Sequence, residues 1–469
     1  MDQSSSARIE RVLEAWVASA SPGARLPSTR ELIARHAASP VTVQSALRSL
    51  AARGLIETRP GVGAFVSAGR AVGPRDHSWQ TGVLGPSSTA ATETSAALRT
   101  VRTDAISLHS GYPDRELLPE RLVRAALTRA ARSAAALERP EPAGTTGLRA
   151  WFASELASQT PAHLTAPTMQ DVIVLPGSQL GLGSLFRSIV GPGGTLLIES
   201  PTYWGAIVAA RQVGVTLVPV PAGPEGPDLV ALEQAFVDTG ARAFYAQPNY
   251  ANPTGAQWSP STSARVLEVV RDRRAFLIED DWAHDFGITT EATPLATRDD
   301  SGHVVYVRSL TKSISPSIRV AAVIARGPLR TRLLADLQAQ SMYVSGLLQS
   351  AALDVVTQPG WQTHRRALRK LLRARRDLLV DAISTHVRSA TISAIPPGGL
   401  NLWVRLPDAV DLDRLTKDTE SKGLVLAGGD EWFPAEPTGR YLRLNFAGPD
   451  PAAYGHAATL LGESLAMLT

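Results

Sequence analysis

Residues 308–320 read RSLTKSISPSIRV and place one lysine, Lys312, among hydroxyl side chains, with Arg319 seven residues further along the chain. A lysine amine whose pKa is lowered can attack an aldehyde and form a Schiff base. Hydroxyls such as that of Ser309, together with an arginine guanidinium, can hold a phosphate group. A solvated lysine on a surface loop is the simpler alternative, so the choice depends on what the rest of the sequence places beside Lys312.

Polar residues also end several other apolar runs. VIVLP is followed by GSQ, where the free N–H groups at the start of a helix favour an anion. TLLIE is followed by SPTYWG, AFYAQ by PNYANPTG, and AFLI by EDDW. Taken alone, each has a simpler interpretation, such as glycines for close helix packing, a core tyrosine or a proline turn. The polar residues of interest in these segments are Ser178, Gln179, Tyr203, Asn252 and Asp280.

Residues 105–469 alternate short apolar runs with helical patterns such as SQLGLGSLFRSIV. This alternation predicts an α/β fold with a mainly parallel sheet, and we expect a smaller α+β part at its C-terminal end. Ligands of such sheets bind beyond the carboxyl ends of the strands, where the polar segments fall. A helix N-terminus, an aromatic ring, an acid and a lysine on successive strands suit a phosphorylated aromatic aldehyde with a basic ring nitrogen.

Over most of residues 105–450, the chain resembles the fold-type I, aspartate-aminotransferase-like domains that bind pyridoxal 5′-phosphate. The resemblance implies that Lys312 forms the Schiff base, that Tyr203 stacks on the cofactor and that Asp280 pairs with its ring nitrogen. YLRLNFAG resembles the segment whose arginine, here Arg443, binds an amino-acid carboxylate in a bidentate fork. A strand-edge arginine is the alternative. The residues implied to bind the cofactor are Ser178, Gln179, Tyr203, Asn252, Asp280, Ser309, Lys312 and Arg319.

Two positions depart from the pattern of that family. Trp282 follows the two acids where a tyrosine is usual, and an indole cannot act as a phenol acid. Arg139 lies where a tyrosine that reaches the partner subunit's cofactor is common. We expect cofactor binding to survive both changes and transamination to become inefficient.

The composition restricts the class of protein. With 469 residues the chain exceeds one ordinary core, and with no cysteine it has neither disulfides nor thiolate metal sites. His284 and His364 lack partners at ligand spacing, so we expect no metal site. The absence of a long apolar run and of a signal-like start predicts a cytoplasmic protein that does not contact membranes. The basic run at residues 364–376 could touch DNA or be a solvated helix face.

Residues 1–70 hold nine arginines, no lysine and five acids, a net +4 that equals the charge of the whole chain. We call residues 1–70 the head and residues 105–469 the body. A positive head on a neutral body suggests that the head binds a polyanion, although solvated arginines would give the same net charge. The spacing predicts three helices, with capping signals at Ser28 and Ser39. LIETR and AFVS, joined by PGVG, then predict a hairpin, which completes a winged helix-turn-helix.

LPSTREL, TVQSALRSLAARGLIE and GVGAFV resemble the DNA-binding domain of GntR-type regulators. Pro40 stands where relatives usually have arginine, so one common DNA contact is absent. A helical interaction module that does not bind DNA is the alternative. The residues implied to contact DNA are Arg30, Thr42, Gln44, Arg48, Gly61 and Gly63.

We therefore divide the chain into a winged helix-turn-helix at 1–67, a flexible linker at 68–104 and a cofactor-binding body at 105–469. The whole resembles the MocR-type transcriptional regulators. The resemblance implies a homodimer that binds double-stranded DNA at two half-sites and senses an amine, an amino acid or pyridoxal phosphate through Lys312. The alternative is an active pyridoxal phosphate-dependent aminotransferase with a fused helix-turn-helix domain.

Overall fold

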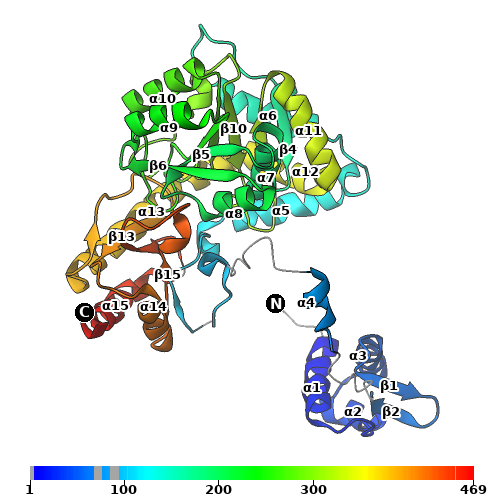
Figure 1. Cartoon of the computed structure of the whole chain (residues 1–469). Helices are drawn as coiled ribbons and strands as arrows, with labels where there is room; N and C mark the ends of the chain where they lie inside the picture. Colours follow the sequence, from blue (N-terminus) through cyan, green and yellow to red (C-terminus); the bar gives the residue numbers. More distant parts are fainter. Residues whose placement is uncertain (1–4, 68–75, 85–94, 103, 449, 469) are drawn as a thin grey trace. The chain divides into compact units, whose positions relative to one another are not determined.

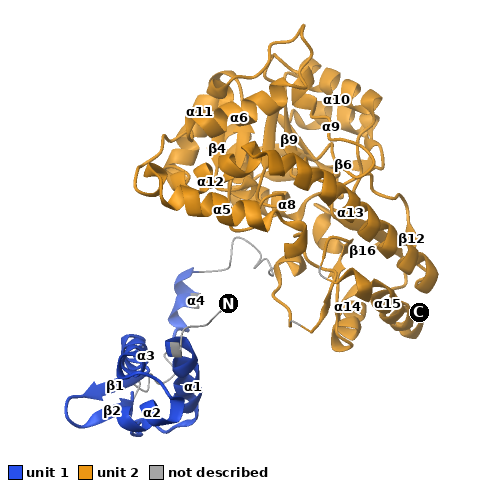
Figure 2. Ribbon diagram, turned by 180° about the vertical axis from the view of Figure 1, so that it is seen from behind, with its two compact units in different colours: residues 1–88 blue, residues 89–469 orange. Residues whose placement is uncertain are grey.

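The computed structural model of the protein describes residues 5–67, 76–84, 95–102, 104–448 and 450–468. The chain divides into two compact units, residues 1–88 and 89–469, coloured separately in Figure 2. Each unit has its own hydrophobic core, and each is described below by itself. Among the helices of the described ranges, none combines the length and the apolar character that crossing a membrane requires.

The first unit has the predicted order of elements (Figure 1). Ser28 and Glu31 form the predicted capping box, and Ser39 caps the third helix through the N–H of Thr42. The helical spacing of Ile9, Val12 and Leu13 predicts one buried face for the first helix, but Val12 is 49% exposed. The elements are α1 (Ser5–Ser19), α2 (Thr29–His36), α3 (Pro40–Ala52), and the antiparallel hairpin of β1 (Ile56–Arg59) and β2 (Gly63–Val66).

The predicted linker, residues 68–104, is only partly described, because 68–75, 85–94 and 103 lie outside the described residues. The short helix α4 (Trp79–Leu84) belongs to the first unit. The short 3-10 helix η1 (Ala96–Leu98) instead packs on the body, where the Ser95 hydroxyl donates to Glu431 at 2.9 Å. The composition explains why this segment does not fold alone, and its contacts with the body explain why it is ordered there.

The second unit contains an eight-stranded sheet whose five central strands run parallel, which confirms the predicted α/β fold. β11 runs antiparallel to both of its neighbours, and β7 is an antiparallel edge strand. The strands, in spatial order, are β4 (Val172–Leu175), β11 (Ala321–Ile324), β10 (Val304–Ser309), β9 (Phe276–Asp281), β8 (Ala243–Ala246), β5 (Thr195–Ser200), β6 (Thr216–Gly223) and β7 (Gly226–Pro227).

Helices cover both faces of this sheet, as Figure 1 shows for the body. Because neighbouring strand residues point to opposite faces, alternate residues of each strand enter two separate cores. One face is covered by α7 (Ser178–Ile189), α8 (Trp204–Val213) and α11 (Gly327–Ser341). The other face is covered by α5 (Glu120–Ala131), α6 (Thr146–Ala157), α9 (Leu229–Thr239), α10 (Pro260–Asp272) and α12 (Gly346–Thr357).

A smaller α+β part follows, as expected. The 28-residue helix α13 (Pro359–His386) leads to an antiparallel sheet, and this part has its own core. The first strand of the body, β3 (Ile106–Ser107), pairs with β14 (Leu424–Val425) of the smaller part. The remaining elements are β12 (Thr391–Ile392), β13 (Asn401–Leu406), α14 (Leu412–Ser421), β15 (Ala427–Gly428), β16 (Arg440–Asn445) and α15 (Tyr454–Leu468).

Candidate functional site

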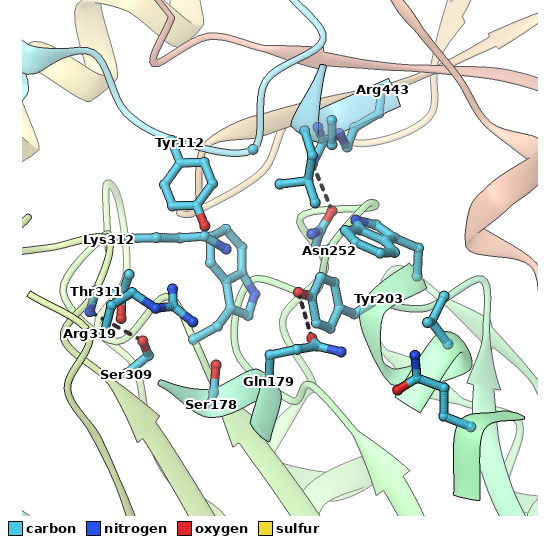
Figure 3. Close-up of a pocket in the computed structure, with 17 residues that line it drawn as sticks. Tyr112, Ser178, Gln179, Tyr203, Asn252, Ser309, Thr311, Lys312, Arg319 and Arg443 are labelled. Atoms are coloured by element: carbon cyan, nitrogen blue, oxygen red, sulfur yellow. Dashed lines mark hydrogen bonds between the residues drawn. The ribbon is translucent and has the colours of Figure 1, made fainter. Parts of the chain in front are cut away.

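A cavity of about 370 Å³ lies where the loops after β4, β5, β8, β9 and β10 meet β16 of the smaller part. It therefore lies at the carboxyl ends of the parallel strands, where the fold predicts a ligand. Figure 3 shows Ser309 and Arg319 on one side of the cavity and Arg443 on the other, with Tyr203 between them. Of the predicted cofactor and effector residues, the cavity brings together Ser178, Gln179, Tyr203, Asn252, Ser309, Lys312, Arg319 and Arg443.

One end of the cavity suits an anion. α7 begins at Ser178, directly after Gly177, whose φ of 94° is a conformation that glycine adopts readily. A β-carbon on Gly177 would lie 2.5 Å from Nη2 of Arg319, so only a glycine lets the guanidinium lie this close to the start of the helix. The hydroxyl of Thr311, which also lines the cavity, has no hydrogen-bond partner among the described residues. Helix N–H groups, a guanidinium and hydroxyls together match a phosphate.

Lys312 is positioned just after β10 on the wall of the cavity. Burial lowers the pKa of its amine to about 8, and the positive charges of Arg443 and Arg319 act in the same direction. The carboxylate of Asp280 acts in the opposite direction. A larger fraction of this amine is therefore neutral at neutral pH than for a solvated lysine, as a nucleophilic amine requires.

Tyr203 and Gln179 are held by each other. The Tyr203 hydroxyl donates to Gln179 Oε1 at 3.0 Å, and Gln179 Nε2 donates to the Gly205 carbonyl at 2.7 Å. The Lys312 amine lies 6.0 Å from the centroid of the Tyr203 ring. The side chain of Gln179 thus fixes the ring, so it is the main-chain N–H of this residue, at the start of α7, that is available to an anion.

Asp280 and Asp281 point to opposite faces of β9, as the alternation of a strand requires. Both are buried. Asp280 Oδ2 accepts bonds from the Tyr245 hydroxyl at 2.7 Å and from Gln247 Nε2 at 2.8 Å, whereas its Oδ1 has no partner among the described residues. Asp281 instead accepts a bond from the Tyr306 hydroxyl at 2.6 Å. Asp280 therefore has a free buried acceptor, which a protonated ring nitrogen would satisfy.

The opposite end of the cavity contains a buried arginine. Arg443 Nη2 donates to the His109 carbonyl at 2.5 Å, and Nη1 lies 3.5 Å from Asn252 Oδ1. The guanidinium lies 4.8 Å from the centroid of the Trp432 ring, and burial lowers its pKa to about 10. Its Nε has no hydrogen-bond partner in the described part of the chain. Because this guanidinium is poorly solvated, binding of a carboxylate to it in the cavity is favoured.

The cavity also contains Tyr112, which was not predicted from the sequence, and Trp282, which replaces the tyrosine usual in the family pattern. Tyr112, on the loop after β3, lines the wall with its ring centroid 5.8 Å from the Lys312 amine. Trp282 lies closer, with its ring centroid 4.1 Å from the same amine, and its Nε1 donates to the Tyr250 carbonyl at 3.1 Å. The apolar stretch before Tyr112 is too short to indicate a strand end, so the sequence carries no clear signal for this residue.

The residues present fit pyridoxal 5′-phosphate. The anion-binding end of the cavity suits its phosphate, and the free acceptor on Asp280 suits its ring nitrogen. Lys312, with its lowered pKa, suits its aldehyde. Arg443 lies on the far side and is left for a second, carboxylate-bearing molecule.

In the first unit, the predicted DNA-contacting side chains lie on α2 and α3. Arg30, Gln44 and Arg48 are exposed, whereas Thr42 is half-buried and its hydroxyl lies 2.8 Å from that of Ser39. Arg25, for which no separate role was predicted, donates from Nη2 to the Val62 carbonyl at 2.7 Å and so supports the hairpin.

The predicted hairpin glycines, Gly61 and Gly63, have φ angles of 74° and 134°. Both angles favour glycine, because side-chain-bearing residues rarely adopt them. The turn between β1 and β2 therefore depends on these two positions.

The basic run of α13 is solvated on one side, where Arg366, Lys370 and Arg373 are exposed, and contacts the body on the other. Arg365 pairs with Asp285 at 3.2 Å, and Arg369 Nε donates to the Gly287 carbonyl at 3.2 Å. Arg376 is buried and donates to the Pro396 carbonyl at 2.8 Å. These arginines therefore connect the long helix to loops of the body.

Comparison with known proteins agrees with this arrangement. Residues 103–461 match the family of class I and II aminotransferases, and residues 5–66 match the gntR family of bacterial regulatory proteins. The HTH-type transcriptional regulator YdfD of Bacillus subtilis, itself uncharacterised, is 27% identical over 91% of this chain and 88% of its own length. The probable rhizopine catabolism regulatory protein MocR of Rhizobium meliloti is 27% identical over 91% of this chain and 86% of its own.

Among solved structures, the body is similar to LysN, the α-aminoadipate aminotransferase of Thermus thermophilus, in complex with N-(5′-phosphopyridoxyl)-L-leucine. The TM-score is 0.72 and the identity 26%, over 78% of this chain and 93% of LysN. The chain thus belongs to the class I and II aminotransferase family, whose cofactor is pyridoxal 5′-phosphate. It also carries a domain of the gntR family, and this combination is similar to that of MocR-type regulators.

Proposed function

We propose that this protein is a transcription regulator in which Lys312 bonds the cofactor aldehyde, and in which an amine, an amino acid or pyridoxal phosphate itself controls DNA binding. The observation that carries the proposal is the position of Lys312. Its amine has a lowered pKa and faces a cavity with one arginine at each end. The same chain carries a DNA-reading domain, for which a turnover enzyme has no use.

Each side chain of the cavity has a separate part in the proposal. When bound, pyridoxal phosphate supplies an aldehyde that condenses with amines and a ring that accepts electrons. Ser178, Ser309 and Arg319 hold the phosphate. Tyr203 stacks on the ring, with its hydroxyl fixed by Gln179.

The remaining cavity residues act on the reacting atoms and on the effector. Asn252 would donate to the ring oxygen of the cofactor, and Asp280 would accept from its protonated ring nitrogen through the oxygen that has no partner among the described residues. Lys312 presents an amine whose pKa of about 8 leaves a larger neutral fraction than a solvated lysine has. Arg443 takes the carboxylate of an amino-acid effector. With the cofactor bound, the effector's amine would take the place of the Lys312 amine on the aldehyde carbon and leave the lysine amine free. We propose that this change biases closure of the body and reorients the head.

The head contacts DNA through Arg30, Thr42, Gln44 and Arg48 of α2 and α3, with Gly61 and Gly63 shaping the wing. A DNA-reading head of this kind binds one half-site, so two half-sites require two copies of the chain.

A homodimer is supported by exposed apolar side chains of the body. Leu137 is 94% exposed and Met342 71% exposed, and Tyr343 beside Met342 is 40% exposed. The segment that contains Leu137 lies close to the one that follows Met342, because a β-carbon on Gly346 would lie 3.3 Å from the Ala135 carbonyl oxygen. An apolar surface of this kind favours contact with another protein surface.

A working aminotransferase is the second candidate. Lys312 and Arg443 on one cavity, with the charge of Asp280 acting on Lys312, favour it. Trp282 counts against it, because its one donor is used by the Tyr250 carbonyl and an indole offers no phenol proton.

The proposal is tested with the purified full chain reconstituted with pyridoxal phosphate. Borohydride reduction followed by peptide mass analysis should place the cofactor on Lys312, and Lys312→Ala should abolish the attachment. Binding of the reconstituted protein to the DNA upstream of its own gene, measured by gel retardation, should then change when an effector amine is added. An unmodified Lys312 contradicts the proposal, and steady turnover of an amino acid with a keto acid supports the aminotransferase instead.

A further inference from the structure

The cavity has one wall that neither the phosphate nor the carboxylate explains. This wall, called here the side wall, consists of Ala97, Leu98, Trp204, Val208 and Gln212. Trp204, Val208 and Gln212 are spaced four residues apart on α8, so they form one stripe along the helix. Ala97 and Leu98 come from η1, which lies within the predicted linker. The side wall is therefore built from two elements that are far apart in the sequence.

The side wall is held in place by contacts outside the cavity. Ser95 Oγ accepts from the Ala97 N–H at 3.2 Å and donates to Glu431 at 2.9 Å. Arg99 pairs with Glu420 at 2.6 Å. Ala97 is buried, whereas Leu98 is 50% exposed. An apolar side chain that is half exposed beside a cavity can lose that exposure when a ligand covers it.

The charges around the cavity are unevenly distributed. All three charged side chains that line it are basic, namely Lys312, Arg319 and Arg443, and the proposed function assigns each of them to the cofactor or to a carboxylate. The side wall contains four apolar residues and one amide, Gln212. A charged group buried against this wall would lack a partner of opposite charge there, and such burial is costly.

We propose that the effector is an α-amino acid with an uncharged, mainly apolar side chain that lies between η1 and α8. The proposal rests on the proposed function, because Lys312 must engage the effector's amine and Arg443 its carboxylate. The side chain then extends along the side wall and covers Leu98 and Val208. The selecting element is thus in part η1, so recognition of the side chain involves the segment that leads towards the DNA-binding unit.

The first test measures binding by calorimetry with the full chain reconstituted with pyridoxal phosphate. L-Leucine should bind at least about tenfold more tightly than L-glutamate or L-lysine, the usual scale for a mismatched pocket. Val208→Arg places a cation on the side wall and should reverse the order of leucine and glutamate. Val230→Arg, at a position 80% exposed on α9 and outside the cavity, is the matched control and should keep the original order.

The second test uses the absence of cysteine from the chain. Leu98→Cys introduces a single thiol on the side wall, and Val230→Cys introduces a single thiol on α9 as its control. Saturating L-leucine should slow alkylation of the thiol at position 98 by at least about fivefold, as burial of a half-exposed group predicts, and should leave the thiol at position 230 unaffected. This measurement depends neither on turnover nor on the folding of the arginine variant.

The outcomes distinguish the two proposals. If Lys312 carries the cofactor but glutamate or lysine binds best, the side-chain inference is wrong and the proposed function survives. If leucine fails to protect the thiol at position 98, the placement of the side chain is likewise wrong. If Lys312 carries no cofactor after borohydride reduction, both proposals fail. Leucine preference together with selective protection at position 98 supports the inference.

Discussion

The amine of Lys312 lies 4.1 Å from the centroid of the Trp282 ring. The indole therefore covers the lysine with its π face and does not direct its N–H towards it, since that N–H is bonded to the Tyr250 carbonyl. A ring face close to an ammonium group stabilises the cation by cation–π attraction. Trp282 thus covers the amine of Lys312. It offers no acidic proton, whereas the tyrosine that is usual at this position in the aminotransferase-like family does.

Trp282→Tyr should raise the rate at which the reconstituted protein converts an amino acid to its keto acid. A phenol at this position adds a donor near the proposed ring oxygen, and general acid catalysis is worth about a hundredfold or more when well placed. We expect about a tenfold gain, because the backbone bond to Tyr250 is lost at the same time. Single-turnover absorbance measurements check it, and Trp282→Phe, which brings no hydroxyl, should give no gain.

The reaction of the apoprotein with pyridoxal phosphate should depend on pH through Lys312. Its pKa is about 8 in place of the ordinary 10.5, so the neutral fraction rises about tenfold per pH unit below about 8 and levels off above it. Stopped-flow measurements between about pH 6 and about pH 9.5 check this. A rate that still rises steeply at the upper end would indicate an ordinary lysine and contradict the proposed role of burial.

The same pKa predicts an effect of pH on stability. Folding lowers the pKa of Lys312, so the unfolded chain binds the proton more tightly between about 8 and 10.5. Its destabilising contribution is therefore complete below about pH 8 and disappears as the pH rises to 10.5. Lys312→Met should stabilise the apoprotein at pH 7 more than at high pH, as thermal unfolding would show. An equal effect at both pH values contradicts this.

Asp280→Asn and Asp281→Asn should separate cofactor binding from stability. Burial raises the pKa of Asp280, and one of its oxygens has no partner, so the neutral amide should leave the apoprotein about as stable. It should weaken cofactor binding by about tenfold or more through loss of the contact with the ring nitrogen. Asp281→Asn replaces the charged acceptor of Tyr306 and His284 by a neutral amide oxygen and should cost about 1–3 kcal/mol of folding free energy.

Equilibrium dialysis of the cofactor and thermal unfolding of the apoproteins measure these two effects. The two variants serve as each other's control, because they make the same chemical change on neighbouring residues. If Asp281→Asn weakens cofactor binding more than Asp280→Asn does, the assignment of the two faces of β9 is wrong.

The order of polar residues along the chain was enough to predict much of the cavity. Each of Ser178, Tyr203, Asn252 and Lys312 follows closely after a strand, and parallel strands bring such residues to one edge. Tyr112 could not be found this way, because its loop is held at the cavity by partners distant in sequence, through the pairing of β3 with β14 and a bond from Asn445 Nδ2 to the Tyr112 carbonyl. That pairing joins segments more than 300 residues apart, and no local pattern indicates it.

The sequence was also insufficient where a side chain has two possible partners. Gln179 could have bonded an anion directly, but the Tyr203 hydroxyl and the Gly205 carbonyl take its amide. Similarly, the composition of residues 95–102 indicates a linker, whereas bonds from Ser95 and Arg99 to the body fix the segment there. In both cases contacts with residues distant in sequence decide between alternatives that the local sequence permits equally.

We expect two exposed side chains of α3 to contact DNA in different ways. Gln44 and Arg48 are both exposed on α3, one turn apart. Gln44→Ala removes a neutral group that can bond a base edge, so it should weaken binding to the operator by about 1–3 kcal/mol, leave binding to unrelated DNA unchanged and keep the salt dependence. Arg48→Ala, if this arginine binds phosphate, should weaken binding to both DNAs and reduce the slope of log affinity against log salt by about one.

Fluorescence anisotropy at several salt concentrations, with an operator duplex selected from random DNA and with a scrambled duplex, measures both effects. Arg8→Ala, on the exposed side of α1, removes one positive charge away from α3 and is the matched control. It should change neither the specificity nor the slope by as much as Arg48→Ala does. If Gln44→Ala weakens binding to both duplexes equally, Gln44 does not read bases, and the sequence specificity must come from other residues of the head.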